Sequence, residues 1–378
     1  MTSDTKKIRV IFSGGGTLGS VMPLVAVLQE LKKRAVFDYD FLWVGIKNGP
    51  EKIMAEKNRV AFVSLPEAKL RRYFSWQNFT DVFSFVAAFF KSARLIKKWR
   101  PDILISAGGF MSVPLHLAAC LLKKKTIILQ EDVVVGLANK IMSRFADFIA
   151  VSLESQIKKF AAGKTIWLGN PIREEMFYGT REKAIGLFLL APDLPIILVL
   201  GGGTGALNLN KILMDGLEKI VRVAQVIHVF GRGKDAAVPF FTGRETDSLI
   251  KERYHPVEFL DSSILADVYA AADLVVTRAG FSTLSELAVL GKPFISVPIP
   301  RTHQEQNATF FYEKAGALIF NESRGGWELA NLLVENIKNK EELVLLGGRL
   351  KKIMLIDARE KFAVLVEEIV KKNKNPPA

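Results

Sequence analysis

Two glycine runs in this chain of 378 residues are candidate sites for binding a phosphate group. Gly14–Gly16 follows the apolar run "IRVIF", and Gly201–Gly203 follows "IILVL". A loop that joins a strand to the N-terminus of a helix presents free backbone N–H groups, and glycine lets a diphosphate approach that backbone closely. Neither run is a Walker A motif or a good match to GxGxxG. Tight α/β turns also carry glycine for steric reasons, so a ligand site and a packed turn both remain open.

The segment Thr277–Pro300 holds a second set of polar groups, at a predicted strand-to-helix turn. Ser282 and Thr283 stand at the helix start, and Glu286 follows one turn later. In one interpretation the helix N-terminus binds a phosphate and Glu286 binds ribose hydroxyls. In the other, Ser282 with Ser285 and Glu286 only caps the helix. The residues alone do not choose between these two interpretations.

The segment Leu70–Arg100 combines aromatic and basic residues. On a helix its apolar residues share one broad face: Phe79, Val82, Phe83, Val86, Phe89 and Phe90. The residues that we expect to contact a membrane are Arg71, Arg72, Phe74, Trp76, Phe85, Phe89, Lys91, Arg94 and Lys98. Aromatics edged by cations are typical of a helix that lies on anionic lipid. A crossover helix that packs its phenylalanines on a sheet has the same pattern, and the two interpretations are compatible.

Composition narrows the classes of function. The formal net charge of +13 favours an anionic partner, but no nucleic-acid recognition motif accompanies it. The four histidines lack metal-ligand spacing and no CxxC occurs, so no metal site is expected. A single cysteine excludes a disulfide framework and suits a reducing compartment. No signal-peptide pattern opens the chain, and no apolar run is long enough to cross a bilayer.

The elements that must position these residues are short apolar strands alternating with amphipathic helices. Such near-continuous apolar strands predict parallel sheets covered on both faces, and two successive series predict two doubly wound, Rossmann-like α/β domains. The predicted strand of "VEFL", Val257–Leu260, belongs to the second series. A proline-marked break near 171–195 places the boundaries at 1–172, 173–357 and a C-terminal helix and tail at 358–378. Ligands of open α/β sheets bind at the carboxyl ends of the strands, which puts the expected site in a cleft between the domains.

Taken in order, several segments resemble those of a known enzyme family over nearly the whole chain. They include "GGGTLGSVMPLVAVLQEL", "LGNPIR", "LGGGTGALNLN", "TRAGFSTLSELAVLGKPFISVPIP" and "HQEQNA". Together they are similar to the MurG family of bacterial glycosyltransferases, family 28 with the glycosyltransferase-B fold. The resemblance implies transfer of N-acetylglucosamine from UDP-N-acetylglucosamine to a polyprenyl-diphosphate-linked muramyl-pentapeptide in peptidoglycan synthesis. It also implies a peripheral enzyme on the cytoplasmic face of the membrane, with no cofactor, metal or nucleic acid.

The resemblance assigns site residues to both domains. Those that would bind the donor are Thr17, Leu18, Gly19, Asp132, Arg173, Gly202, Gly203, Thr204, Leu260, Phe281, Ser282, Thr283, Leu284, Ser285, Glu286, His303 and Gln304. Those that would bind the acceptor are Gly15, Gly16, Thr17, Gly108 and Gly109. The first domain would receive the lipid and contact the membrane, and the second domain would hold the UDP-sugar.

Two departures from the family pattern fall in the first domain. Leu18, Gly19 and Ser20 stand where the family has two glycines and a histidine in its first loop, and "LQED", Leu129–Asp132, replaces "HEQN". An inverting displacement needs a base for the acceptor hydroxyl, so Glu131, Asp132 and Ser20 are the catalytic candidates, with serine the poorest base. A transferase with another lipid or glycan acceptor, and a catalytically silent UDP-sugar- or membrane-binding relative, are the alternatives.

Overall fold

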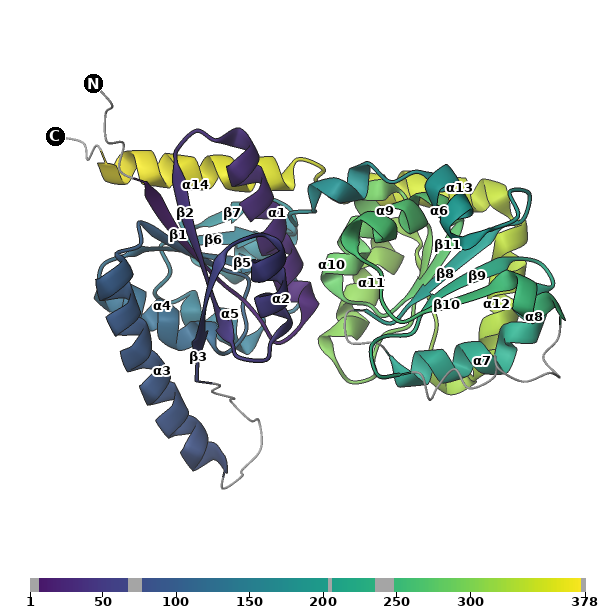
Figure 1. The fold of residues 1–378 in the computed structure, drawn as a ribbon, viewed down its shortest axis with the longest axis horizontal. Coiled ribbons are helices and arrows are strands. Elements are labelled where there is room, and N and C mark those ends of the chain that lie inside the picture. The colour runs from purple at the N-terminus through teal and green to yellow at the C-terminus, as the bar shows by residue number, and fades with distance from the viewer. Residues whose placement is uncertain (1–6, 67–76, 203–205, 235–247, 375–378) are drawn as a thin grey trace. The chain divides into compact units, whose positions relative to one another are not determined.

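The computed structural model describes residues 7–66, 77–202, 206–234 and 248–374, with the side chains of 77–82 and 374 excepted. The chain divides into two compact units, Met1–Arg173 with Leu355–Ala378, and Glu174–Met354 (Figure 1). Each unit is a parallel sheet with helices on its faces, so the predicted pair of doubly wound α/β domains is confirmed.

The first unit contains a seven-stranded sheet in the order β3-β2-β1-β4-β5-β6-β7, in which neighbouring strands pair in parallel. Its strands are β1 (Ile8–Ser13), β2 (Tyr39–Ile46), β3 (Ala61–Leu65), β4 (Ile103–Ser106), β5 (Lys125–Gln130), β6 (Phe148–Val151) and β7 (Thr165–Trp167). Its helices are α1 (Leu18–Arg34), α2 (Pro50–Lys57), α3 (Gln77–Trp99), α4 (Ser112–Leu121), α5 (Leu137–Met142), the 3-10 helix η1 (Glu154–Lys159) and α14 (Ala358–Lys374).

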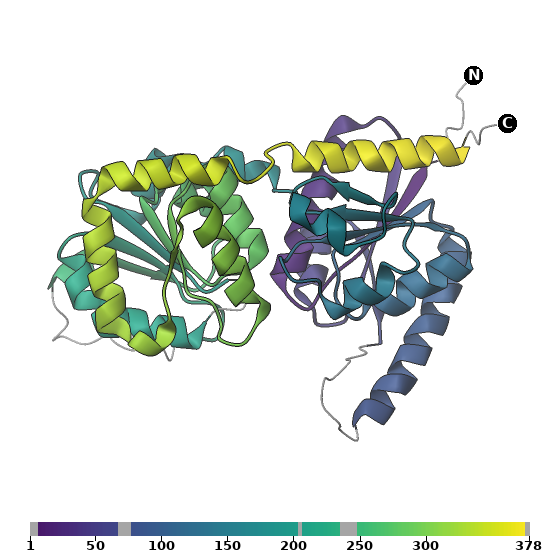
Figure 2. The same ribbon diagram turned by 180° about the vertical axis from the view of Figure 1, so that it is seen from behind.

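Strand periodicity explains how the helices cover both faces of this sheet. Val10 and Phe12 of β1 join the core cluster that contains α1 and α14, whereas Ile11 joins the cluster that contains α3 and α4. Successive side chains of a strand point to opposite faces, so an unbroken apolar run supplies both cores. The C-terminal helix α14, yellow in Figure 2, packs against α1, and an ion pair of 2.8 Å joins Arg34 to Glu367.

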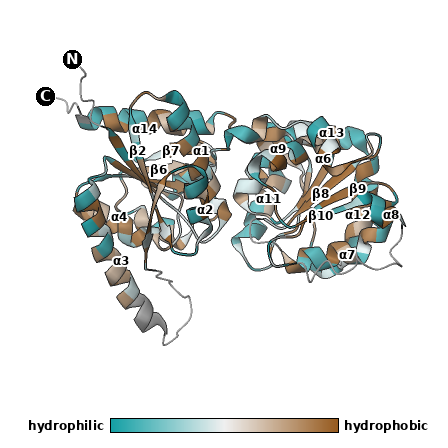
Figure 3. Ribbon diagram, viewed as in Figure 1, coloured by the Kyte–Doolittle hydropathy of each residue, from teal (hydrophilic) through white to brown (hydrophobic). Residues whose placement is uncertain are grey.

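The second unit contains a six-stranded parallel sheet in the order β10-β9-β8-β11-β12-β13. Its strands are β8 (Ile196–Leu200), β9 (Gln225–Val229), β10 (Tyr254–Val257), β11 (Leu274–Thr277), β12 (Phe294–Ser296) and β13 (Leu318–Ile319). Its helices are η2 (Glu174–Phe177), α6 (Arg181–Phe188), α7 (Leu207–Val221), α8 (Ser248–Arg253), α9 (Ser262–Ala271), α10 (Phe281–Leu290), α11 (His303–Ala315), η4 (Glu322–Arg324), α12 (Gly326–Lys338) and α13 (Lys340–Lys351). Figure 3 shows apolar residues along the strands of both sheets.

One strand differs from the sequence prediction. The strand expected at Val257–Leu260 begins earlier, as β10 over Tyr254–Val257, and it includes Pro256. Proline lacks an N–H group, so strands that contain it lie at sheet edges, and β10 is the edge of this sheet. None of the helices in the described ranges combines the length and the apolar character that a bilayer span requires.

Candidate functional site

The carboxyl ends of β1, β4 and β5 bring three predicted loops together in the first unit. These strands are neighbours in a parallel sheet, so the loops that follow them leave the same edge. The loops contact each other closely, because a Cβ atom on Gly109 would lie 3.1 Å from the carbonyl oxygen of Gly15. Gly108 and Gly109 also have φ angles of 93° and 83°, which favour glycine. The structure therefore places the proposed acceptor glycines of both loops side by side.

A buried carboxylate fills the inner side of the first glycine loop. Glu51 of α2 is fully buried, and its Oε1 accepts a hydrogen bond of 2.7 Å from the Ile46 N–H. A Cβ atom on Gly15, Gly45 or Gly49 would lie 2.4, 2.4 or 2.2 Å from Glu51 side-chain atoms. The packed-turn interpretation thus explains Gly15. Sequence analysis missed Glu51, although two flanking glycines before a helix-starting glutamate were a visible signal.

Ser20 braces the first loop from the first turn of α1. Its hydroxyl donates to the carbonyl oxygens of Gly15 and Thr17, both at 3.3 Å. These contacts make the hydroxyl a donor to the backbone. Thr17 is the N-cap residue of α1 without a side-chain cap, while Leu18 and Gly19 are half-buried beside it.

Glu131 is the buried member of the two candidate carboxylates after β5. Burial first, and the charge of Asp132 second, raise the pKa of Glu131 well above its ordinary value. Its Oε1 has no hydrogen-bond partner among the described residues, whereas Asp132 is half-buried. Gln130 and Gln156 hold this loop by donating to the Asp132 carbonyl oxygen at 2.7 and 2.6 Å. A carboxyl with a raised pKa accepts a proton strongly once it is ionised.

The carboxyl edge of the second sheet gathers the predicted donor residues of that unit. Gly202 follows β8 with a φ of 82°, and a Cβ atom on it would have no neighbour within 4 Å among the described residues. Leu260 follows β10 and is buried. Gly203 and Thr204 lie outside the described residues. Gly202 therefore meets open space, unlike Gly15.

Helix α10 follows β11 and begins at Phe281, with Gly280 as its N-cap residue and no side-chain cap. Of the two interpretations left open by the sequence, capping by Ser282 does not occur, because the helix begins one residue before that serine. Ser285 instead donates to the Phe281 carbonyl oxygen at 2.7 Å. The first N–H groups of a helix without a cap are available to an anion.

Glu286 lies one turn into α10 and is buried. Tyr269 of α9 donates to its Oε2 at 3.3 Å, which holds the carboxylate in place. On the same helix, Leu284 is fully buried in the core and Thr283 is half-buried. Leu284 is therefore a packing residue, whereas Thr283 and Glu286 keep polar groups close to the start of the helix.

Gln304 and His303 begin α11, which follows β12. Thr302 caps this helix by accepting a hydrogen bond from the Gln304 N–H at 3.3 Å. The Gln304 side chain accepts from the Ile299 N–H at 3.1 Å, and His303 is exposed. Arg173, the last residue of the first unit, is buried.

A charged network that sequence analysis missed joins four loops of the same edge. Arg278, directly after β11, forms a 2.7 Å ion pair with Glu322 of η4 and donates to the Val297 carbonyl oxygen at 3.0 Å. Asn208, in the first turn of α7, donates to Glu322 at 3.3 Å. Arg278 is therefore neutralised within the protein and positions the loops around Gly202.

Helix α3 exposes part of the apolar face that the sequence predicts. Phe83 and Phe90 are 74% and 65% exposed, and Val86 is exposed beside them. Phe85 and Phe89, which we predicted at the membrane, are half-buried and pack against two core clusters. This correction follows from the helical period, which turns these two residues toward the sheet and α4. Lys91, Arg94 and Lys98 are exposed, whereas Arg71, Arg72, Phe74 and Trp76 lie outside the described residues.

Comparison with known proteins covers both units. The glycosyltransferase family 28 N-terminal domain matches residues 10–151, and the family 28 C-terminal domain matches residues 196–347. The chain belongs to glycosyltransferase family 28. Its enzyme class is therefore that of a glycosyltransferase, as the resemblance implied.

Two relatives carry the same name, UDP-N-acetylglucosamine--N-acetylmuramyl-(pentapeptide) pyrophosphoryl-undecaprenol N-acetylglucosamine transferase. The protein from Borrelia turicatae is 34% identical over 97% of this chain and 99% of its own length. Transferase 3 from Bacillus thuringiensis is 33% identical over 83% of this chain and 87% of its own length. Among solved structures, Acinetobacter baumannii MurG matches 96% of this chain and 99% of its own, with a TM-score of 0.72 at 22% identity. That structure supports the fold.

No cluster of three or more histidine, cysteine or acidic side chains that could hold a metal occurs in the described part of the chain.

Proposed function

We propose that this family 28 enzyme transfers N-acetylglucosamine from UDP-N-acetylglucosamine to the 4-hydroxyl of undecaprenyl-pyrophosphoryl-N-acetylmuramyl-pentapeptide. The observation that carries the proposal is the similarity to two transferases of that name, over 97% and 83% of this chain. The donor would lie at the carboxyl edge of the second sheet. The uncapped start of α10 would offset the charge of the diphosphate, and Glu286 would accept from ribose hydroxyls.

The first unit would supply the acceptor site and the base. Gly15 and Gly16 follow β1, Gly108 and Gly109 follow β4, and Glu131 and Asp132 follow β5, so all six residues leave the same edge of the sheet. The 4-hydroxyl would attack the anomeric carbon while Glu131 takes its proton, and the bond to UDP would break with inversion. Backbone N–H groups and the dipole of α10 would stabilise the leaving UDP, so the reaction would need no metal.

Turnover with the lipid acceptor tests this proposal. UDP release should require both UDP-N-acetylglucosamine and the muramyl-pentapeptide lipid. Release that occurs only with another lipid or glycan would support a transferase with a different acceptor. Binding of UDP without release under any of these conditions would contradict an enzymatic role.

Replacing Glu131 tests the base. Glu131→Gln should lower kcat by about 10²-fold or more and leave donor affinity nearly unchanged. Asp132→Asn, which changes the neighbouring carboxylate, is the matched control and should have a smaller effect. Because the pKa of Glu131 is raised, the rate of the natural enzyme should rise with pH above the ordinary carboxyl range. Unchanged turnover in Glu131→Gln would exclude this residue.

The exposed face of α3 is the proposed membrane contact. Phe83 and Phe90 would enter the interface of an anionic bilayer while Lys91 and Arg94 meet lipid phosphates. Phe83→Asp with Phe90→Asp should weaken sedimentation with anionic vesicles. Trp327→Asp, at a 64% exposed aromatic residue of α12, is the control and should sediment normally. Equal sedimentation of all three proteins would leave α3 as a packing helix only.

A further inference from the structure

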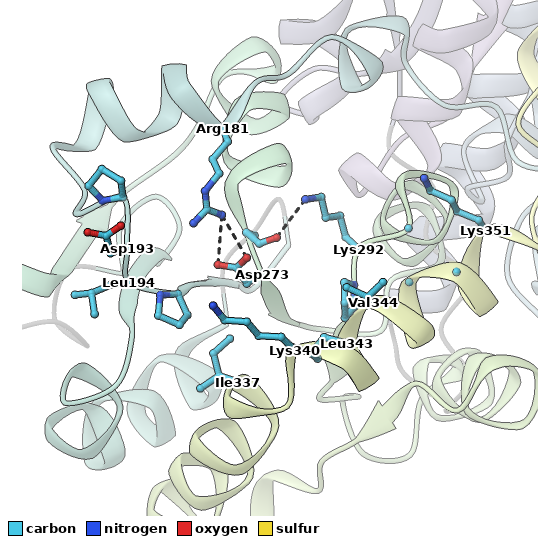
Figure 4. Close-up of a pocket in the computed structure, with 17 residues that line it drawn as sticks. Arg181, Asp193, Leu194, Asp273, Lys292, Ile337, Lys340, Leu343, Val344 and Lys351 are labelled. Atoms are coloured by element: carbon cyan, nitrogen blue, oxygen red, sulfur yellow. Dashed lines mark hydrogen bonds and ion pairs between the residues drawn. The ribbon is translucent and has the colours of Figure 1, made fainter.

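The second unit has a pocket at the amino edge of its sheet, opposite the edge that carries Gly202 and Glu286. Its floor consists of residues that precede three strands, among them Pro195 before β8, Asp273 before β11 and Pro293 before β12. Helices α6, α12 and α13 supply its walls (Figure 4). Its volume of about 560 Å³ falls within the range of about 300–1,000 Å³ that small-molecule sites occupy. The size suits a ligand, and the location separates it from the donor site.

Positive charge is in excess in this pocket. Four cationic side chains line it, Arg181, Lys292, Lys340 and Lys351, against the two carboxylates Asp193 and Asp273. The excess is therefore two positive charges. Burial lowers the pKa of Lys292, and although Asp273 opposes this shift, the charges of Arg181 and Lys351 lower the pKa further. The charges of Arg181 and Lys351 thus act on Lys292, and an anion in the pocket would offset them.

Part of this positive charge is already paired with acceptors inside the protein. Asp273 accepts from Arg181 at 3.3 Å and from the Ile196 N–H at 2.8 Å. Lys292 donates to the carbonyl oxygens of Ala270 and Ala272 at 2.7 and 3.2 Å. In contrast, neither Lys340 nor Lys351 has an ion-pair or hydrogen-bond partner among the residues that the structure describes. These two ammonium groups are the ones available to a ligand.

Two adjacent glycines of α13, Gly347 and Gly348, have different steric environments. A Cβ atom on Gly347 would lie 2.3 Å from the Gly291 carbonyl oxygen, so helix packing requires that residue. A Cβ atom on Gly348 would have no neighbour within 4 Å, and Gly348 lines the pocket. Glycine inside a helix costs about 1 kcal/mol relative to alanine. No packing contact in the described protein accounts for that cost at Gly348, and the missing side chain leaves the pocket open.

We propose that this pocket binds a phosphomonoester that carries an apolar group. Lys340 would bind the phosphate as a point charge, and a dianion would match the excess of two positive charges in the pocket. Leu194, Ile337, Leu343 and Val344 would contact the apolar group; Val344 is 75% exposed in the free protein. The site is distinct from the donor site and does not depend on the proposed transfer reaction.

Calorimetric titration of the full chain with phenyl phosphate tests the proposal. We expect one saturable site with a Kd of about 1 mM or below, which corresponds to about −4 kcal/mol. Phenol, which lacks the charge, should not bind, and benzoate, with a single charge, should bind about tenfold more weakly. Saturating UDP should leave the Kd for phenyl phosphate unchanged, since the donor edge lies at the other ends of the strands. No saturable binding, or competition by UDP, would overturn the proposal.

Two variants locate the site. Lys340→Glu places an acidic residue in the first turn of α13, which the helix tolerates, and should weaken binding about tenfold or more. Gly348→Leu should fill the pocket, weaken binding to a similar degree and keep or raise Tm, because leucine favours helix. Lys314→Glu makes the same charge change at an exposed position outside the pocket and should bind normally. Both pocket variants should retain UDP release, so loss of this site and failure of the transferase proposal are separate results. Normal binding by both pocket variants would exclude this pocket.

Discussion

The two glycine loops are alike in sequence, but glycine is required in each for a different physical reason. In the first unit, a Cβ atom on Gly14 would lie 3.0 Å from the Leu24 Cδ1 atom, and one on Gly15 would lie 2.4 Å from the Glu51 carboxylate. In the second unit, a Cβ atom on Gly202 would contact none of the residues that the structure describes, and its φ of 82° favours glycine. The first loop is therefore packed against its own domain, whereas Gly202 faces space.

The supports of the two loops differ in the same way. Glu51 fits among three glycines and accepts the Ile46 N–H. Around the second loop, the Arg278–Glu322 ion pair joins segments that follow different strands. Steric fit thus maintains the first edge, and buried charge maintains the second. Each support can be removed separately.

Breaking the buried ion pair should have the largest effect. Glu322→Leu leaves the Arg278 charge buried without its partner and should lower the free energy of unfolding by about 3–5 kcal/mol. Urea denaturation would measure this loss. The double variant Arg278→Met with Glu322→Leu should recover most of it, since neither charge remains. If the double variant is no more stable than Glu322→Leu, buried charge does not maintain this edge.

The loss of stability at acidic pH depends on one buried histidine in each unit. Burial lowers the pKa of His116 to about 4 and that of His228 to about 3. Unfolding restores their ordinary pKa of about 6.5, so both residues favour the folded state less as pH falls below 6.5. The expected loss at pH 5 is about 2 kcal/mol for each residue.

The two histidines differ in their partners. His228 lies 2.6 Å from the Tyr254 hydroxyl and 3.0 Å from the Asn210 Oδ1, whereas both His116 nitrogens lack partners in the described residues. His116→Leu should remove its share of the pH dependence and cost little at pH 7.5. His228→Leu should cost about 1–3 kcal/mol for each polar group that it leaves unpaired. Guanidinium unfolding at pH 5 and pH 7.5 measures the free energy of unfolding of both variants. Equal losses of stability for the two variants at pH 7.5 would contradict the expected difference between the two histidines.

Alanine at the two loops tests the comparison directly. Gly15→Ala should lower the free energy of unfolding by about 1–3 kcal/mol through overpacking against Glu51. Gly202→Ala should cost about 1–2 kcal/mol through its backbone angle alone. Adding Glu51→Ala should compensate Gly15→Ala with a coupling energy of about 0.5–3 kcal/mol and should not compensate Gly202→Ala. Additive effects at Gly15 and Glu51 would show that the carboxylate is not the cause.

Removing the Ser20 hydroxyl should have the smallest effect. Its two hydrogen bonds to the first loop are long, at 3.3 Å, and they only support the loop backbone. Ser20→Ala should therefore change turnover by about twofold, equivalent to about 0.5 kcal/mol. Steady-state kinetics with the lipid acceptor would measure this change. A loss of the size expected for Glu131→Gln would instead make Ser20 catalytic.

The sequence pattern predicts the two α/β domains, and it places the proposed site residues at the carboxyl edges of their sheets. Strands buried on both faces must be continuously apolar, so "IRVIF" and "IILVL" predict strands of parallel sheets. The glycines that follow mark the carboxyl ends of these strands. The family resemblance added a proposed donor-binding role for Phe281–Glu286. Helical period identified the aromatic face of α3, but it did not determine which phenylalanines are covered, because that depends on where the sheet and α4 lie.

The steric reason for each loop glycine and the pairing of each buried charge depend on tertiary contacts. Glu51 meets Gly15, and Glu322 meets Arg278, through packing between segments distant in the chain. The raised pKa of Glu131 likewise depends on the atoms that exclude water from it, and no local pattern encodes them. Periodicity reports which face of an element is buried, whereas desolvation and steric contact depend on what lies against that face.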